Sequence, residues 1–312
     1  LTASETARAI SRLSEVERHL LFTLLSPEDA ADIIEDISET QAADLVEEMP
    51  LEQAAAIIEE MTSDHQADLL SEMDGETSQA ILSKMHRREA KEARMLMDYK
   101  KDCAGGLMVS EFLAYKTDAT IQNVLDDLQE NRSEYANYHV QYFYVVDRDR
   151  KLVGVVRIND LLFPSRKTLL KEIMLSHPLS ISVLATLREL REFFEEHHFF
   201  GVPVIDEKRR LVGVVHPAAI EEAVSKQKTR AFLKLSGIIG GEEFRTMPIL
   251  GRSGRRLSWL SLNIVLNILA ASVIAMYQDT LAAVIALAVF LPMVSDMSGC
   301  SGNQAVAVSM RE

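Results

Sequence analysis

The middle of the chain is decided by the stretch VVDRDRKLVGVV (residues 145–156), which returns as VIDEKRRLVGVV (residues 204–215). Each copy has two runs of β-branched residues around a charged turn, a pattern that predicts a β-hairpin. An amphipathic helix is expected before each hairpin, over residues 121–129 and 187–197. Two copies of a helix–strand–strand unit are expected to pack as a pseudo-symmetric pair, with helices covering the apolar hairpins.

Upstream of this pair, residues 26–86 repeat with a period of twelve, as in DAADII (29–34), QAADLV (41–46) and QAAAII (53–58). Units this short cannot bury an apolar face alone, so we expect successive helices to stack into a small superhelix. Each unit ends in an apolar residue that we assign to the core and not to a metal site: Ile37, Met49, Met61, Met73 and Met85. Residues 87–101 predict one longer charged helix, ended by Gly105-Gly106.

The charge of the chain is unevenly placed. It has 312 residues and a formal net charge of -14, with no Lys or Arg between Arg18 and Lys84. An acidic domain repels nucleic acid, so nucleic-acid binding is not expected. The acids either attract cations or form a solvated surface that keeps the domain soluble, and the sequence is consistent with both roles. Cys103 and Cys300 are too far apart for a disulfide framework or a thiolate zinc site, which indicates a reducing, cytosolic setting.

The end of the chain is predicted to form a membrane hairpin. Residues 258–277 supply about twenty mostly apolar residues, enough to cross a bilayer. Arginines just before this run place its N-terminal side in the cytoplasm. Residues 280–294 would return, and the polar stretch SGCSGNQ (298–304) would lie at membrane depth, where it must line a protein-enclosed or watery path. This pattern indicates transport. Leu1 in place of Met suggests a fragment.

Two motifs give the chain a family resemblance. The doubled hairpin resembles a tandem CBS pair, and Asp98-Tyr99 followed by CAGGLM (103–108) resembles the entry sequence of MgtE-type magnesium transporters. The implied fold is multidomain, α and α+β with membrane helices: an N-terminal α-helical superhelix, a tandem CBS pair, a long connecting helix and the first two transmembrane helices of an all-α membrane domain. The expected boundaries are 1–101 for the N domain, 102–166 and 167–225 for the CBS domains, 226–257 for the connecting helix and linker, and 258–312 for the transmembrane hairpin.

The resemblance implies a homodimeric Mg²⁺ channel or transporter, which could also carry Co²⁺ or Mn²⁺. It would be a multi-pass protein of the plasma (inner) membrane, with its N-terminal domains in the cytoplasm. By resemblance, Asn303 and Gln304 would line the ion pathway. Asp296 either joins them or caps the next helical segment. Oxygen ligands of this kind suit a hard, hydrated cation. The chain would be truncated, without the later pore helices.

The family is understood to sense Mg²⁺ through acids at the interfaces of the N domain, CBS pair and connecting helix. Asp64, Asp68 and Glu222 are the tentative regulatory ligands here. Other positions where acids would be expected carry different residues: Ala219, Gln227, Arg230, Ala231, Thr186, Arg188 and His198. With Lys226 and Lys228 nearby, the connecting helix is expected to pair directly with the acidic N domain without an ion, which would weaken or alter Mg²⁺ gating.

ATP binding is expected to be weak. Adenosine-binding CBS copies usually have Ser or Thr at the end of the second strand and Asp three residues later; the first copy keeps Asp160 but has Arg157. His197-His198 are expected to be structural, because adjacent side chains on a helix diverge by roughly 100°. The alternative function is a membrane-tethered CBS module that senses a ligand and does not transport. An enzyme is not expected, since no nucleophile–base pair or phosphate-cradling loop is present.

Overall fold

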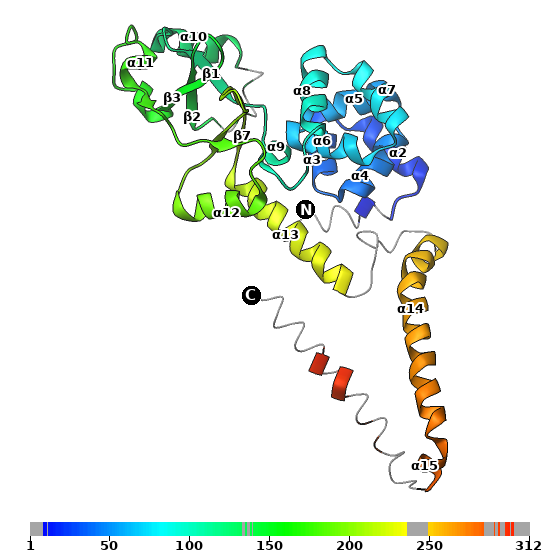
Figure 1. Cartoon of the computed structure of the whole chain (residues 1–312). Helices are drawn as coiled ribbons and strands as arrows, with labels where there is room; N and C mark the ends of the chain where they lie inside the picture. The colour runs from blue at the N-terminus through cyan, green and yellow to red at the C-terminus, as the bar shows by residue number, and fades with distance from the viewer. Residues whose placement is uncertain are drawn as a thin grey trace. The chain divides into compact units, whose positions relative to one another are not determined.

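The computed structural model describes residues 9–10, 12–132, 135, 138, 140–235 and 249–283, with 290, 293, 297–299 and 301–302 beyond these. The chain divides into two compact units, Leu1–Lys228 and Thr229–Glu312. The first unit begins with a stack of helices (Figure 1): α2 (Glu15–Leu24), α3 (Pro27–Glu35), α4 (Glu39–Glu47), α5 (Leu51–Glu60), α6 (Ser63–Glu72), α7 (Gly75–Lys84) and α8 (Arg87–Met97).

The twelve-residue repeat is confirmed, because helices α3 to α8 begin at residues 27, 39, 51, 63, 75 and 87. Each helix packs on the second one along, α3 on α5, α4 on α6, α5 on α7 and α6 on α8. The predicted core row is also confirmed, since its four methionines are buried (Met49, Met61, Met73 and Met85) and Ile37 is partly buried against the same core. Stacking of alternate helices thus builds one continuous apolar core from units that have none alone.

Part of the acidity of this domain has a structural use. Glu35 Oε1 accepts a hydrogen bond from the Thr62 backbone N–H at 3.0 Å, and Glu47 Oε1 accepts from Asp74 N–H at 2.7 Å. Glu59 accepts in the same way from His86 N–H. Each carboxylate lies 27 residues before its donor, so a repeated glutamate caps the N-terminus of a later helix.

The helix predicted over residues 87–101 is shorter than expected. Helix α8 ends at Met97, and Gly105-Gly106 lie inside a separate short helix, α9 (Ala104–Leu107). The chain turns here because the backbone N–H of Ala104 donates to Ala185 O and that of Gly105 to Val183 O, both at 2.8 Å. These bonds tie the end of the helical domain to the second half of the CBS pair.

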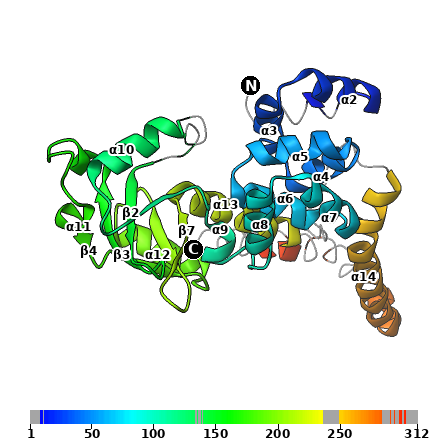
Figure 2. The same ribbon diagram turned by 90° about the horizontal axis from the view of Figure 1, so that it is seen from above.

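The CBS pair contains two sheets in which the predicted hairpins are confirmed. One sheet has the order β1 (Leu113–Lys116), β2 (Tyr142–Val146), β3 (Leu152–Arg157), β4 (Leu175–Ser176), and the other β5 (Ile181–Ser182), β6 (Val202–Ile205), β7 (Leu211–Val215). In each, the first two strands are parallel and the hairpin is antiparallel. The predicted helices are α10 (Ile121–Glu130) and α12 (Leu187–Glu196); η1 (Ile158–Leu161) and α11 (Leu170–Ile173) complete the first copy. Figure 2 shows α10 beside β2 and β3, where Ile121 and Val124 enter the core.

The glycine of each LVGVV copy makes room for a methionine. A Cβ on Gly154 would lie 2.3 Å from Met174 Sδ, and one on Gly213 would lie 2.5 Å from Met108 Sδ. Both distances are far below van der Waals contact, so no larger residue fits without displacing the thioether. The repeated glycine is therefore a packing requirement of both copies.

Helix α13 (Pro217–Leu235) follows β7 and runs past the boundary between the two units. The second unit contains α14 (Ile249–Met276) and α15 (Gln278–Ala283). The apolar run predicted from residue 258 is helical within α14, and large apolar side chains such as Leu260, Ile264 and Leu266 are exposed. Within the part of the chain that the structure describes, no helix is both long enough and apolar enough to cross a membrane.

Candidate functional site

An ion-pair junction joins helix α13 to the helical N-terminal domain. Lys226 Nζ lies 2.8 Å from Glu39 Oε1 of α4 and 2.9 Å from Glu222 Oε1, one turn earlier on α13. The predicted direct pairing of this helix with the acidic domain is therefore observed. Because the lysine side chain is 40% exposed and the Glu39 side chain 21%, the contact is only partly shielded from water.

Glu39 is held by a second lysine as well. Lys101 Nζ lies 2.9 Å from Glu39 Oε2 and 3.4 Å from Asp68 Oδ1 of α6. Burial alone would raise the pKa of Glu39, but hydrogen bonds from Lys226 and Lys101 lower it to about 2. Burial raises the pKa of Asp68 despite the attraction of Lys101. Each oxygen of Glu39 therefore has its own cation.

His65 closes the junction from α6. Its Nδ1 lies 3.3 Å from Glu35 Oε1 and its Nε2 lies 3.8 Å from Glu222 Oε2. Burial alone would lower the pKa of His65, but the neighbouring Glu222 and Glu35 carboxylates raise it to about 11. The interaction with His65, together with that of Lys226, lowers the pKa of Glu222 to about 2 although burial opposes it. The imidazole is therefore a cation in this setting.

A second contact between the helical domain and the CBS pair uses hydrogen bonds. The Glu111 carboxylate accepts from Ser63 N–H at 2.9 Å and from Ser63 Oγ–H at 2.7 Å. Ser110 Oγ–H in turn donates to Glu92 Oε2 at 2.9 Å. This contact joins the two domains without using the charges of the junction.

The structure places the predicted regulatory ligands in different settings. Asp68 and Glu222 both belong to the junction, where protein cations face them. Asp64 accepts hydrogen bonds from Thr62 Oγ1–H at 2.7 Å and from His65 N–H at 2.9 Å at the start of α6. Among the described residues, no group of three or more His, Cys, Asp or Glu side chains is arranged to hold a metal ion.

Sequence reasoning missed three members of the junction, Glu39, Lys101 and His65. One signal was available, since Glu39 is the first residue of a repeat in a window that contains no basic residue. The partners of such an acid must come from outside the repeats. Positions 186 and 188 have local uses: Thr186 caps α12, and Arg188 Nε lies 3.2 Å from Glu192 Oε1.

The remaining predicted site residues are less informative. Asp296, Asn303 and Gln304 lie outside the described residues. Asp160 is bound by Arg157 through two hydrogen bonds, Nε–Oδ2 at 2.9 Å and Nη2–Oδ1 at 3.1 Å. The hydrogen bonds from Arg157 lower the pKa of Asp160. A ribose hydroxyl would have to compete with this bidentate pair for the carboxylate.

Comparison with known proteins supports the assignment of both domains. Residues 1–102 match the MgtE intracellular N domain, and residues 104–164 and 170–226 match the CBS domain. The magnesium transporter MgtE of Bacillus subtilis is 30% identical over 227 residues, which are 73% of this chain and 50% of that protein. The chain thus spans about half the length of the curated relatives it matches.

Solved structures agree. The soluble part of a magnesium transporter is 28% identical, with a TM-score of 0.64, over 73% of this chain and 89% of that one. The cytosolic domain of the Mg²⁺ channel MgtE in complex with ATP is 26% identical, with a TM-score of 0.65, over 72% of this chain and 90% of that one. These relatives are transporters and not enzymes, as expected. Residues 1–226 are an MgtE intracellular N domain followed by a tandem CBS pair, and the chain belongs to the MgtE family.

Proposed function

We propose that the first unit of this chain is the cytosolic regulatory region of a Mg²⁺ transporter. The observation that carries the proposal is the junction, in which Lys226 of α13 pairs with Glu39 of the N domain at 2.8 Å. Helix α13 continues to Leu235, beyond the compact unit that contains the junction. A change in how the N domain is attached would therefore act directly on the helix that leads out of the unit.

The junction is suited to a regulated contact because it is ionic and partly exposed. Exposed ion pairs contribute little free energy, about 0.2–1 kcal/mol each, so the formed and broken states of this ionic contact differ by a small amount. A ligand that binds one state better needs only a few kcal/mol to shift such an equilibrium. This is the physical basis for gating by the N domain.

We propose further that Mg²⁺ gating is weakened here. Lys226, Lys101 and His65 already neutralise the carboxylates of the junction, so a divalent cation would have to displace protein cations to bind there. Asp68 and Glu222, with Asp64 nearby, are the ligands that it would reach. The test is limited proteolysis of the chain with and without millimolar Mg²⁺. We expect little added protection, and a steep rise would contradict the proposal.

The regulatory role can be tested in a chimera. Residues 1–228 replace the matching half of the Bacillus subtilis relative, and Mg²⁺ uptake is measured in cells that need an added Mg²⁺ transporter for growth. We expect uptake that depends less on internal Mg²⁺ than uptake by the parent. Lys226→Glu should restore part of that dependence, because the exchange leaves Glu39 and Glu222 without their shared cation. Dependence equal to the parent's in the unsubstituted chimera would contradict weakened gating.

For the second unit we propose a membrane hairpin in a homodimeric inner-membrane transporter, with its pathway lined by Asn303, Gln304 and Asp296. The exposed apolar side chains along α14 support a lipid environment. Growth rescue of Mg²⁺-auxotrophic cells by the protein, with Asn303→Ala in parallel, tests this role; Co²⁺ and Mn²⁺ uptake test its selectivity. Failure of rescue would favour the alternative, a membrane-tethered CBS module that does not transport.

ATP is a second candidate ligand, because one structural relative is an MgtE cytosolic domain in complex with ATP. We expect weak binding here, since Arg157 occupies both oxygens of Asp160. Isothermal titration calorimetry should show tighter ATP binding in Arg157→Ser, which releases the carboxylate and introduces a hydroxyl. Binding that is already tight in the unsubstituted chain would contradict this expectation.

A further inference from the structure

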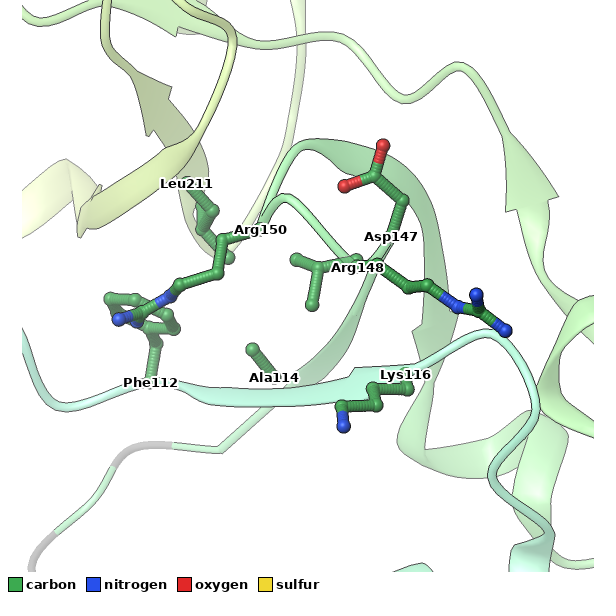
Figure 3. A pocket seen from close by; sticks show the side chains of 8 residues that line it. Phe112, Ala114, Lys116, Asp147, Arg148, Arg150 and Leu211 are labelled. Atoms are coloured by element: carbon green, nitrogen blue, oxygen red, sulfur yellow. The ribbon is translucent and has the colours of Figure 1, made fainter.

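The two CBS turns meet back to back at a cleft that the function described so far does not use. Leu152 N–H donates to Arg209 O and Leu211 N–H donates to Arg150 O, both at 3.1 Å. Beside this contact lies a cavity of about 290 Å³ (Figure 3), close to the lower limit of small-molecule sites. Its lining consists of Phe112, Ala114, Lys116, Val146, Asp147, Arg148, Arg150 and Leu211.

The cleft carries three cations without protein partners. Among the residues that the structure describes, Lys116, Arg148 and Arg150 form no side-chain ion pair or hydrogen bond. Asp147, the acid of the lining, is already engaged, since its Oδ1 accepts from the backbone N–H groups of Asp149 at 2.8 Å and Lys151 at 2.9 Å. The chain has a net charge of -14, so a cluster of unpaired positive side chains is unusual in it, and such a cluster attracts anions.

The second CBS copy provides an internal comparison. Its turn has the same design: Asp206 Oδ1 accepts from Lys208 N–H at 2.9 Å and Arg210 N–H at 2.8 Å, as Asp147 does in the first copy. Lys116 pairs with Val146 in the register of the first sheet, and Ser182 pairs with Ile205 at the matching place in the second.

Two of the three cations are not repeated there, whereas Arg150 has a counterpart in Arg209. Ser182 stands at the position of Lys116, and Glu207 at the position of Arg148 in the turn. The shared backbone therefore requires neither cation. Their presence in one copy alone points to a use beyond folding.

The backbone of Arg150 is also held in place. Its φ is 62°, the left-handed region that a side chain other than Gly, Asn or Asp seldom adopts. Its carbonyl accepts the bond from Leu211, so the turn is braced by the other CBS copy. Figure 3 shows its side chain extending toward Phe112 across one side of the cleft, with Lys116 on the strand below. The arginine stem is thus positioned before any ligand arrives.

We propose that this cleft binds a small phosphate-bearing molecule. Its phosphate would meet Lys116, Arg148 and Arg150, since guanidinium and ammonium groups are the usual partners of phosphate. Its uncharged part would lie against Phe112 and Leu211. The cleft lies at the Leu152 end of β3, whereas Arg157 and Asp160 lie at the other end, so this site is separate from the one considered for ATP.

The test is isothermal titration calorimetry of the full 312-residue chain without divalent cations, with pyrophosphate, inorganic phosphate and phenyl phosphate as probes. We expect pyrophosphate to bind at one site per chain. Arg150→Asn removes the cation and keeps a residue that accepts a left-handed backbone, and it should weaken binding about tenfold. The double variant Lys116→Ser with Arg148→Glu, which copies the second turn, should abolish binding.

The matched control is Arg209→Asn, the same substitution at the same φ in the second turn. It should leave pyrophosphate binding within about twofold, and thermal unfolding midpoints should show that all variants fold. Phenyl phosphate should bind more tightly than inorganic phosphate, because its ring can contact Phe112. The proposal is overturned if pyrophosphate does not bind, or if Arg209→Asn weakens binding as much as Arg150→Asn.

Discussion

The interior of the N domain and the junction between that domain and α13 are held together by different forces. The interior is apolar and periodic, with side chains such as Ile58 and Ile81 fully buried. The junction is ionic, and its Lys226 and Glu222 side chains are 40% and 48% exposed. Apolar burial is non-directional and hard to reverse without unfolding, whereas partly exposed ion pairs respond to pH, salt and competing ions.

The difference teaches where this molecule can respond to its surroundings. A contact that changes with conditions must have a small free energy, and the junction meets that condition while the core does not. Acids in the repeats serve both regions, since Glu59 caps a helix of the stack and Glu39 faces the lysines of the junction. Position in the superhelix therefore separates acids that cap helices from acids that face the lysines of the junction.

The largest effect should come from the core. Ile58→Ala removes a fully buried side chain from α5 and should lower the free energy of unfolding by about 3 kcal/mol, from lost burial and the cavity left behind. Denaturant unfolding measures it. Glu60→Ala, an exposed position on the same helix, is the control and should change stability by less than about 0.5 kcal/mol. Similar losses in both variants would mean that α5 is not packed as described.

Lys226→Ala should have a smaller effect on stability, about 1–2 kcal/mol, because it removes two partly exposed ion pairs. Its effect on the attachment of the N domain to α13 should be larger. We expect a protease to cleave the chain faster once this contact is lost. Lys228→Ala removes an exposed lysine two residues on and should leave cleavage unchanged. Equal cleavage of the two variants would show that the ion pairs do not hold the junction.

The junction should also depend on pH in opposite directions at its two ends. The pKa of Glu222 falls from 4.5 to about 2 on folding, so its contribution is complete above 4.5 and is lost as pH falls toward 2. The pKa of His65 rises from 6.5 to about 11, so its contribution is complete below 6.5 and declines as pH rises toward 11.

Unfolding curves of the unsubstituted chain, His65→Gln and Glu222→Gln over this range measure the two contributions separately. The stability difference between the unsubstituted chain and His65→Gln should shrink as pH rises above 6.5. A difference that stays constant up to high pH would show that the imidazole is not a cation of the junction.

The smallest effect should come from the capping glutamates, where charge serves the stack itself. Glu59→Gln keeps an acceptor for the His86 N–H but loses its charge near the N-terminus of α8, and should cost about 0.5 kcal/mol. Denaturant unfolding measures it, with Glu60→Gln as the control. A loss of stability near that of Ile58→Ala would contradict the view that apolar burial, and not charge, stabilises the interior of the N domain.

Much of the fold was predictable because its signals are local. The twelve-residue spacing, the buried methionine row and both hairpins follow from periodicity over a few residues. Less was predictable where distant segments meet. The segment after α8 is an example: Ala104 and Gly105 bond to the second CBS copy, about eighty residues away along the chain.

The same division holds for the site. That Lys226 would pair with the acidic domain was predictable from charge alone, but its partner was not. Glu39 is 187 residues away, and its place at the start of a repeat does not say which lysine it meets. The unpaired cations of the cleft were likewise not predictable, because Lys116 ends β1 while Arg148 and Arg150 lie in a turn about thirty residues later that resembles its copy.

The amino-acid sequence by itself determined the helical repeat and the doubled CBS hairpin, since both depend on apolar periodicity and turn chemistry within each short segment. Only the tertiary structure decided which carboxylates cap helices, which face lysines and which cations remain unpaired. The physical reason is that electrostatic energy depends on distance and burial between side chains far apart in sequence, and these are set only when the domains pack.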